Sequence, residues 1–300
     1  MAGEPVALAA DGRTAAAAFV CPDRTFLRLW TSRPEDEELG ASSSTELYAG
    51  DGSRPWRLLR VREVRGSGEV AMVAATKDRL GLWVLGPDTI GYRELEGRVE
   101  EVTLDPEARL IASIEGSQLV FRDRSLESLY SANLDGVMNS AYSLRFLEID
   151  GTASLLVSFE NRLVVTSCPP DAKELLTYEH DGRGQILSVE CSSSNIFVGF
   201  SSMGSIKHFR LVGAPPVLGL VEVKYLDIAK EMRYSLDPPS TIPHPYEPLT
   251  LVARDRCLVV LTAFCLLIVD IEASSEIILM PAIYVTPALV IRSLECCDST

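Results

Sequence analysis

An arginine-rich segment is the strongest local departure from the chemistry of an otherwise acidic chain. The segment reads RPWRLLRVREVR over residues 54–65, within 300 residues whose net charge is -14. Guanidinium groups bind carboxylates and phosphates through paired hydrogen bonds. Side chains of an extended strand alternate between its faces, so Arg60 and Arg62 share one face. We predict a partner-binding patch at Arg57, Arg60 and Arg62, against the alternative of a solvated strand whose arginines pair with nearby acids.

Two other segments offer side chains for partner binding. The first is a run of four acidic residues, Glu35, Asp36, Glu37 and Glu38. This run is a docking peptide, a serine phosphorylation region together with the GASSS that follows it, or a solvated loop. The second is the Pro-rich stretch TIPHPYEP over residues 241–248, which we expect to be extended. Tyr246 in this stretch is a candidate anchor for a partner, because aromatic residues dominate interface hot spots, or it packs on its own domain.

Motifs for catalysis are absent from the sequence. It contains no GxxxxGK[ST], HExxH or GxSxG motif, and no Cys/His set with the spacing of metal ligands. The three histidines, His180, His208 and His244, are far apart. We therefore predict no catalytic residue, no cofactor and no bound metal, and we expect a protein that is not an enzyme.

Charge and cysteine content restrict the partners and the compartment. The net charge of -14 opposes nucleic-acid binding, so no direct nucleic-acid partner is expected. Seven cysteines without a CxxC pair fit reduced thiols in the cytoplasm, with the nucleus as the alternative. The longest apolar run, CLVVLTAFCLLIV, is shorter than the 18 or so residues of a membrane helix. No transmembrane segment is expected, and membrane association is predicted only through partners.

The elements that must position these residues are repeated along the chain. The stretch DGRTAAAAFVCPDRTFLRLW, residues 11–30, consists of a strand, a tight turn and a second strand. The same arrangement recurs over residues 65–85, 104–123, 148–167, 190–211 and 253–271. Equivalent positions are 53, 38, 44, 44 and 60 residues apart, and further strand candidates lie between the copies. This is the period of a β-propeller blade of three or four strands.

The first copies resemble a known repeat family. ADGRT, PDRT and FLRLW in residues 10–30 look like a WD40 repeat, and KDRLGLW in residues 65–85 is the next best match. The other copies keep the strand pattern but carry FRD, VTS, FRL and VDI where the family has its WD dipeptide. The resemblance implies a divergent WD40-like fold. We predict an all-β chain that forms a single β-propeller of six or seven blades made of small antiparallel sheets.

The predicted propeller covers residues 1–294. Approximate blades are residues 1–50, 51–98, 99–140, 141–182, 183–224 and 245–294. Residues 225–248 are predicted to be an insert with a short helix, IAKEMRY, and the Pro-rich loop, and residues 295–300 a tail. Strands expected in residues 283–294 either pair with the N-terminal strand or begin a seventh blade.

This organisation indicates a function in binding rather than catalysis. We predict a non-enzymatic protein–protein interaction scaffold that is a subunit of a multiprotein complex, with other proteins as its partners. One alternative is the N-terminal propeller of a larger membrane-trafficking or coat or tether subunit, in which case the chain is part of a longer protein. The other alternative is a propeller hydrolase with a central metal.

Overall fold

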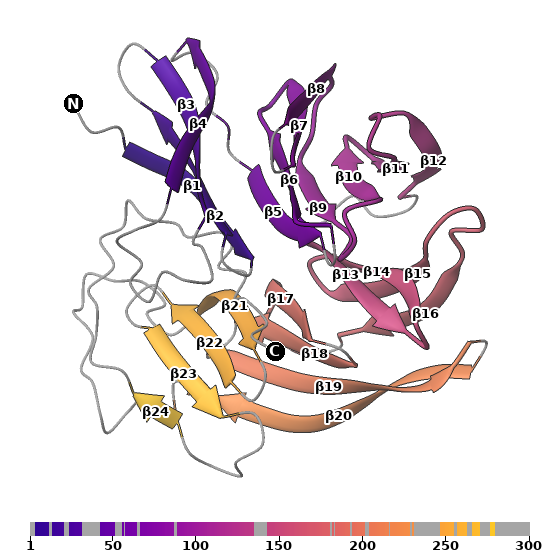
Figure 1. The fold of residues 1–300 in the computed structure, drawn as a ribbon. Coiled ribbons are helices and arrows are strands. Elements are labelled where there is room, and N and C mark those ends of the chain that lie inside the picture. The colour runs from indigo at the N-terminus through magenta and orange to yellow at the C-terminus, as the bar shows by residue number, and fades with distance from the viewer. Residues whose placement is uncertain are drawn as a thin grey trace. The chain divides into compact units, whose positions relative to one another are not determined.

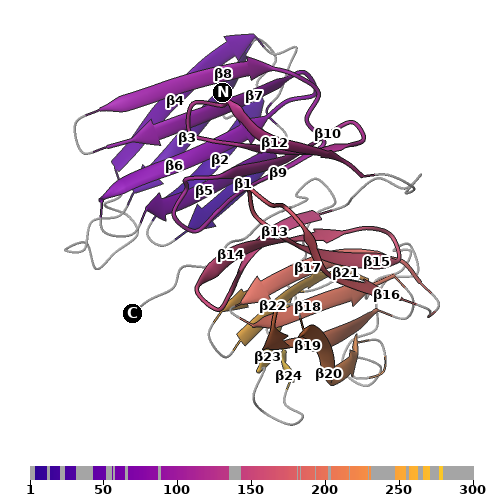
Figure 2. The same ribbon diagram turned by 90° about the vertical axis from the view of Figure 1, so that its right-hand side faces the viewer.

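The structure is a computed structural model that consists almost entirely of β-strands (Figures 1 and 2). It describes residues 4–11, 14–20, 24–31, 43–51, 56, 58–64, 67–86, 89–134, 143–180, 182, 184–192, 194–201, 204–215, 217–228, 230, 247–254, 257–262, 266–270 and 277–279. The chain divides into two compact units, of which the first contains strands β1–β12 and the second β13–β24.

The first unit contains three four-stranded antiparallel sheets, in which strands that follow one another along the chain are neighbours. The strands of the first sheet are β1 (Glu4–Asp11), β2 (Thr14–Val20), β3 (Arg24–Thr31) and β4 (Ser43–Asp51). Those of the second are β5 (Leu58–Val64), β6 (Glu69–Ala75), β7 (Arg79–Leu85) and β8 (Ile90–Glu96). Those of the third are β9 (Glu101–Leu104), β10 (Ile111–Glu115), β11 (Gln118–Arg122) and β12 (Ser128–Asn133).

The second unit repeats this topology in three more sheets. Its first sheet holds β13 (Ser143–Ile149), β14 (Thr152–Ser158), β15 (Arg162–Ser167) and β16 (Glu174–Glu179). The next holds β17 (Ile186–Ser192), β18 (Asn195–Phe200), β19 (Ser205–Ala214) and β20 (Val217–Asp227). The last holds β21 (Pro248–Arg254), β22 (Cys257–Thr262), β23 (Leu266–Asp270) and β24 (Ile277–Leu279).

Sheets inside each unit are buried on both faces, which explains why the inner strands are continuously apolar. In β6, Met72 and Ala74 belong to the core shared with the first sheet. Ala71 and Val73 belong to the core shared with the third sheet. A strand that is covered on both faces has no reason to alternate apolar with polar residues. The two cores account for the run EVAMVAA, which lacks the simple alternation of a half-buried strand.

The fourth strand of each sheet is its outer edge, and burial falls there. Five of the seven residues of β6 are fully buried, whereas six of the seven residues of β8 are exposed. Four of the six residues of β12 and five of the eleven residues of β20 are exposed, and neither strand has a buried residue. This gradient places the described surface of each unit mainly on fourth strands and turns.

The all-β class and the small antiparallel sheets predicted from the sequence are confirmed, and the described residues form six such sheets. β20 ends at Asp227, inside the predicted insert 225–248. Most of the predicted helix, the Pro-rich loop before Glu247 and the strands expected in residues 283–294 lie outside the described residues.

Candidate functional site

Two arginines of the predicted patch, Arg60 and Arg62, lie on β5, and Arg60 forms an ion pair inside the protein. Its side chain is 6% exposed, and Nη2 donates a hydrogen bond to Oε1 of Glu101 on β9 at 2.8 Å. Nη1 donates to the carbonyl oxygen of Leu59 at 3.0 Å. This ion pair joins the second and third sheets of the first unit. Arg62 is partly buried, Arg57 lies outside the described residues, and a partner-binding role for the patch stays a prediction.

A second ion pair repeats this arrangement in the other unit. Nε of Arg145 on β13 lies 3.3 Å from Oε2 of Glu190 on β17, and both side chains are largely buried. Nη1 of Arg145 donates to the carbonyl oxygen of Leu144 at 2.9 Å, as Arg60 does to the residue before it. Each arginine is the third residue of the first strand of its sheet, and each glutamate lies on the first strand of the next sheet. The sequence analysis did not predict this repeated pair, because the arginine and the glutamate are 41 residues apart in the first unit and 45 in the second.

The other predicted binding residues cannot be placed. The four acidic residues 35–38 and Tyr246 all lie outside the described residues. Their proposed roles in binding partners stay predictions.

The β19–β20 hairpin is a candidate site that the repeat analysis missed. These are the longest described strands, with 10 and 11 residues. β18 pairs with β19 as far as Arg210, and the amide of Leu211 donates to the carbonyl oxygen of Ser194. Beyond Leu211 the described ladder has two strands only, which stay paired as far as Ala214 and Val217 beside the turn (Figure 1). An isolated two-stranded ribbon is marginally stable, so a ribbon of this kind needs a covered face or a partner.

One face of this hairpin is covered by the protein's own core. Leu211 is buried, and Leu218 and Leu220 pack beside it on the core between the fourth and fifth sheets. Glu222 lies on this same face, because it is opposite the core residue Phe209, and it forms an ion pair with Lys207 at 3.1 Å. The negative charge of Glu222 is therefore neutralised by Lys207 on the covered face.

The opposite face of the hairpin is open and apolar toward its tip. We call it the hairpin face and define it by six residues, His208, Arg210, Val212, Val217, Val221 and Lys224. Directly opposite residues of an antiparallel pair share a face, and His208 is opposite Lys224, while Arg210 is opposite Val221. Val212, Val217 and Val221 are 40%, 79% and 50% exposed. Large apolar side chains exposed together on a monomer mark an interaction site more often than scattered ones do.

Cationic groups gather at the base of the hairpin face. The pKa of His208 is lowered, first by burial and then by the positive charges of Arg210 and Lys224. His208 stacks on Phe197 with ring centroids 4.6 Å apart, and its Nε2 lies 2.8 Å from Oδ1 of Asn195. The two acidic residues described in β19 and β20, Glu222 and Asp227, alternate onto the covered face. Arg210 and Lys224 are thus the two cationic residues of β19 and β20 that lie on the hairpin face.

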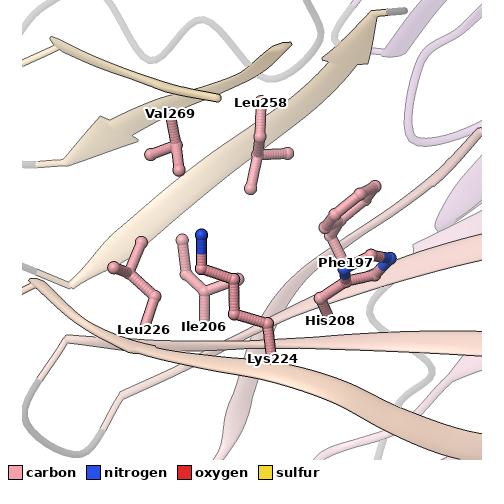
Figure 3. Close-up of a pocket in the computed structure, with 7 residues that line it drawn as sticks. All are labelled: Phe197, Ile206, His208, Lys224, Leu226, Leu258 and Val269. Carbon is pink, nitrogen blue, oxygen red and sulfur yellow. The ribbon is translucent and has the colours of Figure 1, made fainter. Parts of the chain in front are cut away.

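A small apolar notch adjoins this cluster between the fifth and sixth sheets (Figure 3). A cavity of about 20 Å³, room for about one water molecule, lies between side chains of β18–β20 and of β22 and β23. The lining residues are Phe197, Ile206, His208, Lys224, Leu226, Leu258 and Val269. The Lys224 side chain rises from β20 and directs its ammonium group toward Leu258 and Val269. Its small size and apolar lining provide no set of groups for acid–base chemistry.

The described part of the chain has neither a metal-ligating cluster nor a membrane-spanning helix. No group of three or more His, Cys, Asp or Glu side chains there is arranged to hold a metal ion. Within the same residues, no helix has the length and apolar character needed to cross a membrane.

Comparison with known proteins supports the fold. No family model and no curated protein matches the sequence. Among solved structures, the chain is similar to the β-propeller domain of Myceliophteria thermophila Cps50 (Swd1), with 11% identity and a TM-score of 0.57. The match covers 86% of this chain and 79% of that chain. At this identity the likeness shows the fold alone, and it confirms the β-propeller fold predicted from the repeats.

Proposed function

We propose that the protein is a non-enzymatic scaffold subunit of a multiprotein complex, and that it holds a partner protein on the hairpin face. The observation that carries this proposal is the exposed valine row of the β19–β20 ribbon beside the cations at its base. Packed blades provide a rigid support, while surface segments of such folds carry the binding function. The structural neighbour is a β-propeller domain, a fold that serves many functions, so the proposal depends on the surface and not on the fold.

The stability of the free protein does not explain why the hairpin face carries exposed valines. The other face of the ribbon already packs its leucines on the core, so the valines add exposed apolar surface without burial. Burying a valine side chain contributes roughly 1.5 to 3 kcal/mol, which the free protein does not gain at these positions. A partner that covers Val212, Val217 and Val221 supplies that burial.

Affinity purification of the tagged chain, followed by mass spectrometry, tests the proposal. The informative variant is Val217→Asp, because this side chain is 79% exposed and a charge there need not disturb the core. Ile90→Asp is the matched control, since Ile90 is 58% exposed on the fourth strand of another sheet. We expect a stoichiometric partner set with the wild-type chain and with Ile90→Asp, and at least about a tenfold depletion with Val217→Asp, as for loss of an interface hot spot.

Two results would contradict the proposal. Recovery of no stoichiometric partner by the wild-type chain argues against a scaffold. Full partner recovery by Val217→Asp shows that a scaffold uses another surface, and the acidic run 35–38, Arg62 and Tyr246 are then the next residues to substitute.

A further inference from the structure

We infer that two copies of this chain pair edge to edge through residues 217–221 of β20, so that their hairpin faces join. The inference goes beyond the proposed function, because it names a second copy of the chain as a binding partner. Three features of β20 carry it: its place at the edge of the fifth sheet, its unprotected apolar residues, and a sequence that reads the same in both directions.

β20 is the outer strand of its sheet. Within the described residues it pairs with β19 only. Alternate residues of an edge strand direct their N–H and C=O groups away from the sheet, where another strand can pair with them. The segment 217–221 lies between the turn that follows Ala214 and the bulge at residues 222–224. It is therefore the regular part of this edge nearest the tip.

The segment 217–221 lacks the features that usually protect an edge strand. Natural edges carry charged side chains, prolines or bulges that prevent pairing with another chain. Residues 217–221 read VLGLV and contain none of these, since the first charged residue of β20 is Glu222. Val217 and Val221 are 79% and 50% exposed. An edge of this kind is a template for a strand of another chain.

The sequence of the segment identifies that other chain as a second copy. VLGLV reads the same in both directions about Gly219. An antiparallel pair with a two-fold axis at Gly219 places Val217 opposite Val221 of the second copy. The same axis places Leu218 opposite Leu220 of the second copy. Directly opposite residues share a face, so valines meet valines on the hairpin face and leucines meet leucines on the covered face.

This pairing adds strands where the hairpin has fewest. Beyond Leu211 the described ladder has two strands, whereas the paired copies form a four-stranded ladder of β19 and β20 from each chain. Val212 is opposite Gly219 and lies on the same face as Val217 and Val221. Each copy therefore contributes three exposed valines to one continuous apolar surface, which is offered to a further partner of the scaffold.

We expect the pairing to be weak and to be opposed by charge. A ladder of five residues from each chain covers less area than the roughly 1,200 Å² of standard stable interfaces. Each copy also has a net charge of -14, so the two copies repel each other. The expected dissociation constant is about 10–100 µM. Higher salt should strengthen the dimer, because it screens the repulsion and leaves the apolar contact intact.

Sedimentation velocity of the full chain at concentrations from about 1 to 300 µM tests the inference. We expect a concentration-dependent shift from a single chain of 32.8 kDa to a dimer. Val217→Lys combined with Val221→Lys should weaken the dimer at least about tenfold, because lysines then lie opposite each other. Ile90→Lys combined with Leu129→Lys is the matched control. These side chains are 58% and 50% exposed on other sheets, and dimerisation should change less than about twofold.

A charge swap shows whether the lysines act across the dimer or disturb the tip itself. Val217→Glu combined with Val221→Lys puts opposite charges across the two-fold axis and leaves the net charge unchanged. This variant should associate at least about tenfold more tightly than the double lysine variant. A wild-type chain that stays monomeric at the highest concentration, or equal affinities of the two double variants, overturns the inference.

Two cysteine variants locate the two-fold axis. Val217→Cys and Val221→Cys place thiols opposite each other only when the two variants are mixed. In either variant alone the introduced thiols are four residues apart along the strand, about 13 Å, which exceeds the roughly 7 Å between Cα atoms that a disulfide can span.

Oxidation with copper–phenanthroline in air should therefore cross-link the mixture and neither variant alone. The wild-type chain, with its seven native cysteines, gives the background. Equal cross-linking in one variant alone shows another register and overturns the inference.

The outcomes separate the dimer from the scaffold function. If the chain stays monomeric while partner recovery depends on Val217, the scaffold function stands and only this inference falls. If the dimer forms in the expected register while no other partner is recovered, the inference stands and the scaffold proposal falls. A monomer whose recovered partner cross-links to Val217→Cys would show that the edge receives a strand of a different protein, which also overturns the inference.

Discussion

At the scale of single residues, two buried arginines join neighbouring sheets in the same way. Arg60 and Arg145 each contact a glutamate of the next sheet and the carbonyl oxygen of the preceding residue. Arginine suits this position because its planar fork makes several hydrogen bonds at once. The sequence identified Arg60 as chemically unusual but could not identify its partner, because Glu101 is 41 residues away and the pairing depends on how the sheets pack.

Arg60→Met should destabilise the fold strongly, because it leaves Glu101 buried without its cation. Breaking a buried ion pair costs about 3 to 5 kcal/mol. The double variant Arg60→Met with Glu101→Met should recover most of this loss, since it removes both charges. Urea unfolding measures the difference.

An exposed pair provides the control for this experiment. Arg98 is 77% exposed in its ion pair with Glu100, so Arg98→Met should change the unfolding free energy by less than about 0.5 kcal/mol. Equal losses in Arg60→Met and in the double variant would show that the arginine stem, and not the pairing, provides the stability.

At the scale of elements, the strand pairs inside each repeat were the predictable part. Tight turns such as KDR and EGS between apolar runs indicated the hairpins β6–β7 and β10–β11 directly. β20 was harder to predict from the sequence, because LVGAPPVLGL contains two prolines and is typical of a loop. The valines of β20 also alternate with leucines instead of polar residues. The leucines pack on the core while the valines are exposed, a distinction that appears only once the neighbouring sheet is in place.

The tip of the β19–β20 hairpin should be sensitive to substitution at Gly213, which is paired with Leu218 close to the turn. Its φ is +81°, and an added Cβ would collide with the carbonyl oxygen of Val217. The left-handed conformation alone costs a non-glycine residue about 1 to 2 kcal/mol. We expect Gly213→Ala to speed amide hydrogen exchange in residues 211–221 by about tenfold or more, because the ladder near the tip has only two strands.

Gly219 provides the comparison within the same hairpin. An added Cβ there lies 3.6 Å from Cγ2 of Val212, an ordinary contact, so Gly219→Ala should leave exchange unchanged or slower. Equal acceleration by both alanines would mean that the ribbon depends on chain flexibility and not on the conformation of Gly213.

At the scale of the whole molecule, the sequence supplied the architecture and the charge but not the binding surface. The six repeats and their spacing were enough for a β-propeller, because a hairpin that cannot cover both of its faces must stack on similar neighbours. The hairpin face is different, since its residues come from both strands of one long ribbon and are brought together only by their register. Composition indicated an acidic surface, and it could not place Arg210 and Lys224 together on one face of that ribbon.

The overall charge leads to a prediction about polyanions. With a net charge of -14, the protein should not bind a labelled DNA duplex of about 20 base pairs at about 150 mM salt more tightly than about 100 µM, the weak end of ordinary non-specific binding. Arg210 and Lys224 on the hairpin face are too few to reverse this, because counterion release requires many phosphate contacts at once. Anisotropy of the duplex measures the affinity, with Arg210→Glu as the paired variant. Tight binding that the variant abolishes would show that local charge outweighs the field of the whole protein, and the hairpin face would then be a phosphate site.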